Sequence, residues 1–143
     1  MELYTKDNIR LNLITTNGDL SLNWLFLPGG PGADACYFTT LLDLLHLPGN
    51  AWLVDLPGNG SHLDQQADFD QWSDLFLNLC KTFENPVVVG HSFGEMLPLL
   101  CQENESILAG FVALSSAPSL WLEEADQCRQ KLDLPDLKEE MAA

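Results

Sequence analysis

Basic residues are scarce in this sequence. Lysine and arginine together number 6, against 21 aspartates and glutamates, which gives a formal net charge of −15 over 143 residues. A surface this acidic repels the phosphate backbone of nucleic acids and the anionic face of a membrane. We therefore expect neither nucleic acid nor membrane as a partner, and we interpret the acidity as that of a solvated surface.

Long apolar runs and metal-binding spacings are also missing. No segment approaches the roughly 18 apolar residues of a membrane span, and the first residues lack the apolar stretch of a signal peptide. The 4 cysteines are widely separated and include no C-x-x-C pair, so neither a zinc site nor a redox motif is predicted. We expect a cytoplasmic protein with buried free thiols and without metal or cofactor.

What is present is enough for one domain with a core of its own, since apolar residues make up 46% of the sequence. Apolar periodicity predicts strands at 9–15, 21–27, 51–55, 86–89 and 108–115, and helices at 33–46, 69–83 and 93–103. Strands that alternate with helices predict a three-layer α/β fold, in which a mostly parallel sheet carries helices on both faces.

Two local details of this fold are also predicted. The turn residues at 17–19, Asn-Gly-Asp, indicate a hairpin between the first two strands. In the helix at 33–46, the apolar positions are Cys36, Leu41, Leu44 and Leu45.

Three unusual loops follow the predicted strands. Residues 28–32 are Pro-Gly-Gly-Pro-Gly, residues 55–62 are Asp-Leu-Pro-Gly-Asn-Gly-Ser-His, and residues 90–94 are Gly-His-Ser-Phe-Gly. Because the carboxyl ends of parallel strands meet at one edge of a sheet, we expect the three loops to gather there. Residues 90–94 fit the G-x-S-x-G nucleophile elbow, in which a serine with a strained backbone joins a strand to a helix. Gly90 and Gly94 would allow the two elements to approach closely.

These loops resemble those of the α/β-hydrolase fold family, and within it those of proline iminopeptidase-like serine hydrolases. That group has H-G-G-P-G after its third strand, D-x-P/R-G-x-G-x-S after its fourth and G-x-S-x-G after its fifth. This sequence has all three in order, with Pro28 in place of the histidine. The resemblance covers the N-terminal portion, up to about the sixth strand, and implies an incomplete α/β-hydrolase fold. Residues 1–118 would belong to the core, and residues 119–143 would begin a cap or form a terminal helical segment.

The resemblance implies a serine hydrolase that acts on a small ester, amide or peptide substrate, with Ser92 as the nucleophile. The backbone N–H groups of Gly30 and Phe93 would form the oxyanion hole. The candidates to line the pocket are Gly29, His91 and Trp121, although packing in the core or the cap is the alternative for Trp121.

The catalytic triad of the family is incomplete here. The family's acidic residue and histidine follow the serine along the chain, whereas residues 93–143 contain no histidine. His91 lies in the elbow and would point away from Ser92, His46 is expected at the end of a helix, and His62 on the second loop is a substitute candidate. We therefore expect a truncated chain that is weakly active or inactive alone.

Two other functions stay open. Without a base, the fold would be a non-catalytic remnant or a binding module that keeps the pocket. Residues 90–95 also resemble the G-H-S-x-G-E of malonyl-type acyltransferases, although those enzymes lack the pattern found at 55–61.

The last predicted strand raises the question of partners. In the family, two further strands lie beyond the one that contains residues 111–114, so its outer edge would be unpaired here. An open apolar edge predicts either self-association or pairing with a second polypeptide that carries the remainder of the fold.

Overall fold

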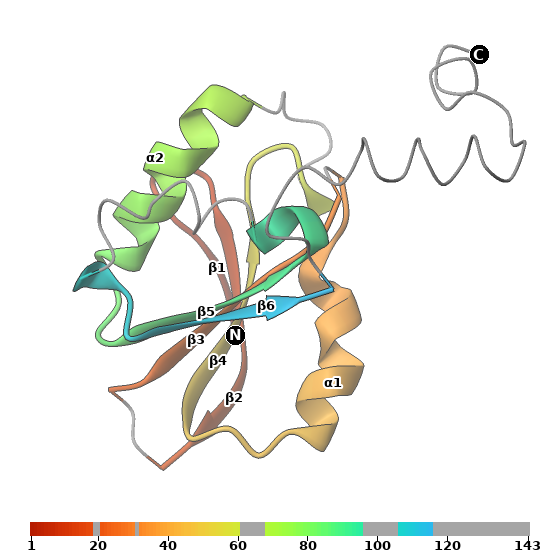
Figure 1. Cartoon of the computed structure of the whole chain (residues 1–143), viewed down its shortest axis with the longest axis vertical. Helices are drawn as coiled ribbons and strands as arrows, with labels where there is room; N and C mark the ends of the chain where they lie inside the picture. The colour runs from red at the N-terminus through yellow and green to blue at the C-terminus, as the bar shows by residue number, and fades with distance from the viewer. Residues whose placement is uncertain (19–20, 31, 61–67, 96–105, 116–143) are drawn as a thin grey trace, which may run out of the picture.

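The computed structural model describes residues 1–18, 21–30, 32–60, 68–95 and 106–115. Its centre is a six-stranded sheet with strand order β1-β2-β4-β3-β5-β6 (Figure 1). The strands are β1 (Glu2–Tyr4), β2 (Arg10–Asn17), β3 (Asn23–Leu27), β4 (Gly49–Asp55), β5 (Pro86–His91) and β6 (Gly110–Leu114). From β4 to β6 all neighbouring strands are parallel, while β2 runs antiparallel to both β4 and β1. The predicted, mostly parallel sheet is therefore confirmed.

Helical segments cover both faces of the sheet, as Figure 1 shows for α1 and α2. On one face, α2 (Phe69–Cys80) buries Trp72, Phe76 and Leu79 at the three- and four-residue spacing of an amphipathic helix. On the other face, the 3-10 helix η1 (Ala35–Phe38) and α1 (Thr39–Leu44) pack against a second cluster of buried residues. The three-layer α/β architecture is confirmed.

The two central strands are apolar toward both layers. In β3, Leu25, Phe26 and Leu27 are all buried. All three consecutive valines of β5 are buried as well, with Val88 in the first cluster and Val89 in the second. Successive side chains of a strand point to opposite faces, so a strand covered on both sides requires apolar residues at every position. This requirement explains why these strands are continuous apolar runs in the sequence.

The predicted hairpin between the first two strands is wrong. β2 pairs with β4, where Leu11 lies opposite Val54, and β3 lies between β4 and β5. The N-terminal partner of β2 is the three-residue strand β1, which periodicity did not reveal because it is too short. A turn signal reports a local bend of the backbone and does not determine which strands pair.

The predicted apolar face of the helix at 33–46 is also wrong. Leu44 is 77% exposed, and Cys36, Leu41 and Leu45 are exposed as well. The buried residues are instead Ala35, Phe38 and Leu42. A 3-10 helix has three residues per turn, so beginning the segment with η1 rotates a different set of side chains toward the sheet. The prediction of buried thiols therefore fails at Cys36 and is confirmed at Cys80.

At the far side of the described sheet, β6 has β5 as its partner strand. Phe111 and Val112 of β6 are 37% and 38% exposed. The predicted cap segment 119–143 and the helix predicted beyond residue 95 lie outside the described residues, as do His62 and Trp121. Among the helices of the described residues, none is both long and apolar enough to span a membrane.

Candidate active site

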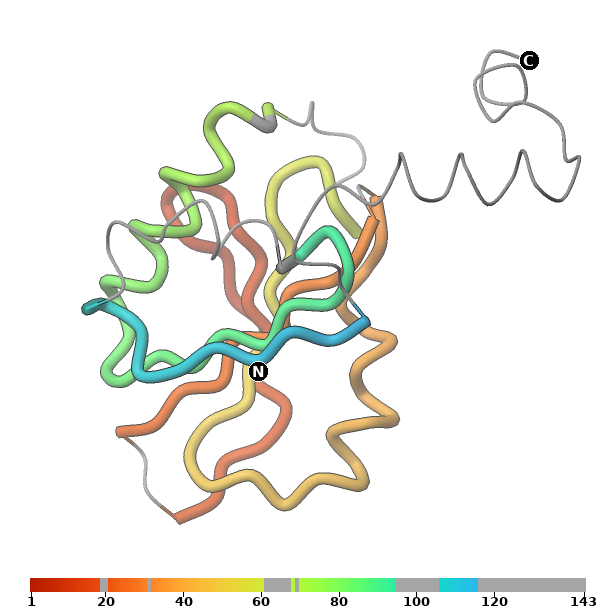
Figure 2. Tube along the Cα trace, in the orientation of Figure 1, coloured from red at the N-terminus to blue at the C-terminus, as the bar shows by residue number. Residues whose placement is uncertain are grey.

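The loops that follow β3, β4 and β5 meet at one end of the sheet, as the path of the chain in Figure 2 shows. The first two loops are joined by a hydrogen bond of 2.6 Å from the Gly32 N–H to Oδ1 of Asn59. The first and third are in contact, because a β-carbon on Gly29 would lie 3.0 Å from Cβ of Ser92. The sequence prediction that these loops gather at the carboxyl ends of the strands agrees with this arrangement.

Ser92 stands at a sharp turn directly after β5. Its φ is 51°, in the left-handed region that few residues other than glycine adopt, and its side chain is exposed. Such a backbone costs about 1–2 kcal/mol for a residue with a β-carbon. The 3-10 helix η3 (Ser92–Glu95) begins at this residue. The turn therefore has the strained serine backbone that the G-x-S-x-G pattern predicted.

The elbow is packed against the end of β3. A β-carbon on Gly94 would lie 2.6 Å from the carbonyl oxygen of Pro28 and 2.7 Å from that of Leu27. On the other side of the turn, the ring of Phe93 packs edge-on against Trp72 of α2, with ring centroids 5.9 Å apart. The close packing of Gly94 and the apolar contact of Phe93 thus fix the backbone that directly follows the strained residue.

Tyr37 of η1 lies between the glycine-rich loop and the elbow. Its hydroxyl is 2.7 Å from the Gly29 nitrogen and 2.8 Å from Nδ1 of His91. The His91 ring also packs edge-on against the rings of Tyr37 and Phe38. Burial raises the pKa of the Tyr37 hydroxyl, and the hydrogen bond from Gly29 offsets this only in part, so the group stays protonated at neutral pH.

Asp55, at the end of β4, holds the start of η1, the helix that follows the glycine-rich loop. Its carboxylate accepts hydrogen bonds from Nη1 of Arg10 at 2.7 Å and from the Ala35 N–H at 2.8 Å. Burial raises the pKa of this carboxyl, against the opposing effects of the Ala35 N–H and the Arg10 charge. A β-carbon on Gly60 would lie 3.0 Å from Cγ of Asp55, so the second loop closes tightly around it. These contacts agree with a structural role for Asp55.

Arg10 is buried, although arginine is a residue type found mostly on protein surfaces. Besides Asp55, it bonds Glu2 at 3.1 Å and lies 3.7 Å from Asp34. Its Nε has no hydrogen-bond partner among the described residues. The guanidinium therefore joins β1, β2, β4 and the start of η1 below the loops.

The comparisons with known proteins decide the family. A family model described as the alpha/beta hydrolase family matches residues 24–138. The chain belongs to the alpha/beta hydrolase family. Curated proteins, by contrast, give no match.

Several solved structures are similar to almost the whole chain. Proline iminopeptidase from Mycobacterium smegmatis has a TM-score of 0.70 and 26% identity, covering 94% of this chain and 49% of that one. An alpha/beta hydrolase from Novosphingobium aromaticivorans has a TM-score of 0.60 and 25% identity, covering 91% and 48%. The N-formylmaleamic acid deformylase of Pseudomonas putida has a TM-score of 0.63 and 17% identity, covering 90% and 55%. The chain thus spans about half the length of these hydrolases.

Most of the residues that the sequence singled out for an alpha/beta hydrolase site lie together. Gly29, His91 and Ser92 are in contact, and Gly30 and Phe93 directly follow two of them. Gly90 is the buried residue of β5 two positions before the serine. His46 is exposed beyond the end of α1, and Trp121 and His62 lie outside the described residues. Sequence reasoning missed Tyr37, whose one available signal was its position just after the glycine-rich loop.

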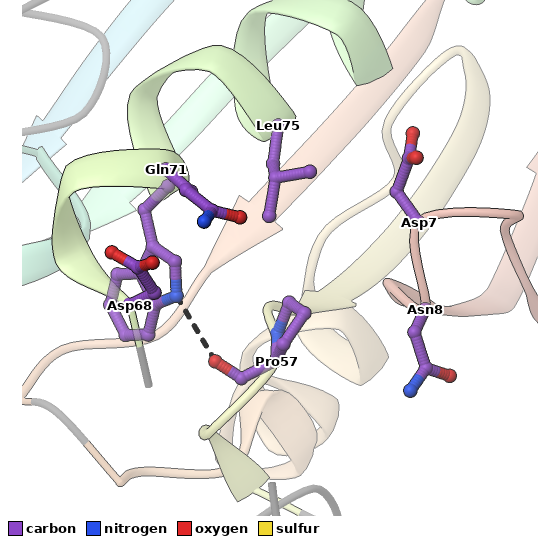
Figure 3. A pocket seen from close by; sticks show the side chains of 7 residues that line it. Asp7, Asn8, Pro57, Asp68, Gln71 and Leu75 are labelled. Atoms are coloured by element: carbon purple, nitrogen blue, oxygen red, sulfur yellow. Dashed lines mark hydrogen bonds between the residues drawn. The ribbon is translucent and has the colours of Figure 1, made fainter. Parts of the chain in front are cut away.

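A cavity of about 250 Å³ lies elsewhere in the described structure, between the start of α2 and the turn that precedes β2 (Figure 3). It is lined by Asp7, Asn8, Pro57, Asp68, Gln71, Trp72 and Leu75. The indole N–H of Trp72 donates to the Pro57 carbonyl oxygen at 3.0 Å and fixes one wall. None of the residues at the elbow lines this cavity. Among the described residues, no three histidine, cysteine or acidic side chains are grouped so that they could hold a metal ion.

Proposed function

We propose that this chain carries the nucleophile of a serine hydrolase and that Ser92 accepts the acyl group of an ester, an amide or a peptide. The observation that carries the proposal is the conformation of Ser92. At the carboxyl end of β5, this residue has a left-handed backbone, is exposed, and lies against the glycine-rich loop. A backbone strained in this way is kept only where the surrounding structure imposes it. The similarity to a proline iminopeptidase at 26% identity makes a peptide N-terminus one of the substrates to test.

The proposed reaction is acyl transfer in two steps. The Ser92 oxygen forms a bond to the substrate carbonyl carbon, a base takes its proton, and the leaving group departs with that proton. Water, which gives its proton to the same base, then attacks the acyl carbon. The bond to the Ser92 oxygen breaks, this oxygen takes the proton back, and the acid is released. The N–H groups of Gly30 and Phe93 would bind the carbonyl oxygen as it becomes negative, and each such donor typically contributes about 3 kcal/mol.

We propose that neither of the described histidines is the base. The hydrogen bond to Tyr37 occupies Nδ1 of His91, and His46 lies beyond the end of α1. The sequence has 3 histidines, all before Ser92. We therefore propose that polypeptide outside the described residues supplies the base and its acidic partner.

The edge of β6 is where we propose that this polypeptide adds to the sheet. The strand is at the margin of the described sheet, Phe111 and Val112 are exposed, and the matched hydrolases are about twice as long as this chain. A second copy of the chain is a poor occupant, because two molecules of charge −15 repel each other. Light scattering of the purified chain should therefore find a monomer, and a stable dimer would contradict this assignment.

A fluorophosphonate probe tests the nucleophile, because it phosphonylates an activated serine. The added mass on the modified peptide is located by peptide mapping. We expect slow labelling of Ser92 in the chain alone and faster labelling with added imidazole, which substitutes for the base. Ser92→Ala should abolish the label, whereas Ser73→Ala on α2 should leave it unchanged. If Ser92 is not labelled even with imidazole, the proposal is wrong and a non-catalytic binding function is favoured.

A further inference from the structure

The hydroxyl of Tyr37 is the polar group that joins the two loops beside Ser92. It lies 2.7 Å from the nitrogen of Gly29 and 2.8 Å from Nδ1 of His91. Position 29 has no space for a side chain, because a β-carbon there would lie 2.8 Å from the same Nδ1 atom. The glycine-rich loop, the tyrosine and the elbow histidine therefore form one contact.

The position of Tyr37 is itself held firmly. η1 begins with a cap in which Oδ1 of Asp34 accepts the N–H of Cys36 at 2.7 Å. The next residue, Phe38, is buried against Phe26 of β3, with ring centroids 5.2 Å apart. The Tyr37 and Phe38 rings are in contact, with centroids 4.5 Å apart. The hydroxyl is thus presented to the two loops by a short helix that is fixed at both ends.

The direction of each hydrogen bond follows from the proton inventory. The backbone N–H of Gly29 can only donate, so the hydroxyl oxygen accepts there. The one proton of the hydroxyl can then be donated to Nδ1 of His91 when that nitrogen carries no proton of its own. The tautomer with its proton on Nε2 is the form of His91 that would accept this hydrogen bond.

We propose that Tyr37 is a positioning residue, whose hydroxyl holds Gly29 against His91 and thereby orients the next N–H, that of Gly30, toward Ser92. The inference rests on the proposed function, because the role of Gly30 as an oxyanion donor is part of it. Tyr37 does not touch the reacting atoms. It acts through the backbone of the glycine-rich loop.

The first test is spectroscopic and needs no activity. Long-range proton–nitrogen NMR spectra of the ring nitrogens distinguish the two neutral histidine tautomers, and His46→Gln and His62→Gln variants assign the His91 signals. At mildly alkaline pH we expect His91 in the Nε2–H form in the wild type. Tyr37→Phe removes the donor but keeps the ring, and should shift the Nδ1 signal and mix the tautomers. Tyr4→Phe is the matched control, since the Tyr4 hydroxyl bonds Glu2 on the edge strand β1. This variant should leave the His91 signals unchanged.

The second test measures the rate of fluorophosphonate labelling at Ser92 in the presence of imidazole. Removing an oxyanion donor outright slows catalysis by about 100- to 1,000-fold. Tyr37→Phe leaves the donor in place but less well oriented, so we expect a smaller loss, on the order of tenfold. Tyr4→Phe should label at the wild-type rate. Thermal unfolding of both variants confirms that the rates compare folded proteins.

A shifted His91 signal together with slower labelling supports the inference. An unchanged His91 signal in Tyr37→Phe overturns it, and so does a shifted signal with an unchanged labelling rate, because the hydroxyl would then position nothing. If the wild type is not labelled at all, the proposed function fails separately. The spectra then determine whether Tyr37 fixes the elbow histidine.

Discussion

Gly94 lies so close to Pro28 that a β-carbon on residue 94 would be 2.6 Å from the Pro28 carbonyl oxygen. Real β-carbons essentially never approach another heavy atom within 3.0 Å, and the atom here is backbone, which cannot move aside as a side chain can. The elbow therefore rests directly on the end of β3. The second glycine of the G-x-S-x-G motif is required by this contact.

We predict that Gly94→Ala lowers the free energy of unfolding by about 1–3 kcal/mol, the usual cost of forcing an extra carbon into a packed site. It should also slow the labelling of Ser92 at least tenfold, because the elbow must move away from the glycine-rich loop. Urea unfolding and the labelling rate measure the two effects. Gly110→Ala on β6 is the matched control: its β-carbon would lie 3.5 Å from a Val87 methyl group, an ordinary contact, and no loss is expected. Equal losses in both variants would contradict the argument.

A second prediction concerns the backbone of Ser92. Ser92→Ala and Ser92→Gly both remove the hydroxyl, so they differ in the β-carbon alone. Because φ is 51° at this residue, the glycine variant should be the more stable by about 1 kcal/mol. The measurement is the difference in unfolding free energy between the two variants.

Ser73 gives the matched comparison for this experiment. It lies in α2 at an ordinary helical φ, so Ser73→Gly should be less stable than Ser73→Ala by about 1 kcal/mol. The sign of the glycine–alanine difference should thus reverse between the two serines. The same sign at both positions would mean that Ser92 is not strained.

The sequence allowed the layers of the fold and the elbow to be predicted because both depend on local patterns. The valine run of β5 and the helical spacing of Trp72 and Phe76 report burial directly. The glycines of the loops mark positions where the backbone bends or where two segments touch. Family membership and the parallel sheet follow from these signals.

What could not be predicted depends on contacts between distant residues. β2 pairs with β4 rather than β3, and no turn residue reveals this. Arg10 bonds Asp55, a residue 45 positions away, and Tyr37 bonds His91, 54 positions away. A buried arginine in a strand looks like a surface residue until its partners are known.

The pair of Arg10 and Asp55 leads to a third prediction. The Arg10 side chain is 10% exposed and that of Asp55 is 1% exposed. Removing one partner therefore leaves the charge of the other buried without its counter-charge. We expect Asp55→Ala and Arg10→Met each to lower the unfolding free energy by about 3 kcal/mol, and the double variant to lose less than the sum. Asp70→Asn, at an exposed site near the start of α2, should change it by less than about 0.5 kcal/mol. Additive losses would show that the two side chains stabilise the fold independently.

The last prediction is the pH dependence of Arg10→Met. Burial already raises the pKa of Asp55 above its ordinary value of 3.8, and the Arg10 charge is among the effects that oppose the rise. Without Arg10 the pKa rises further, so the folded state holds this proton more tightly than the unfolded chain does. Protonation then favours folding, and stability is lost as the pH rises through the raised pKa. The difference in unfolding free energy between the wild type and Arg10→Met should therefore shrink as the pH falls from 7 toward 4. The measurement is urea unfolding across this range. A difference that stays constant or grows toward acid pH would show that Asp55 is not the group left uncompensated.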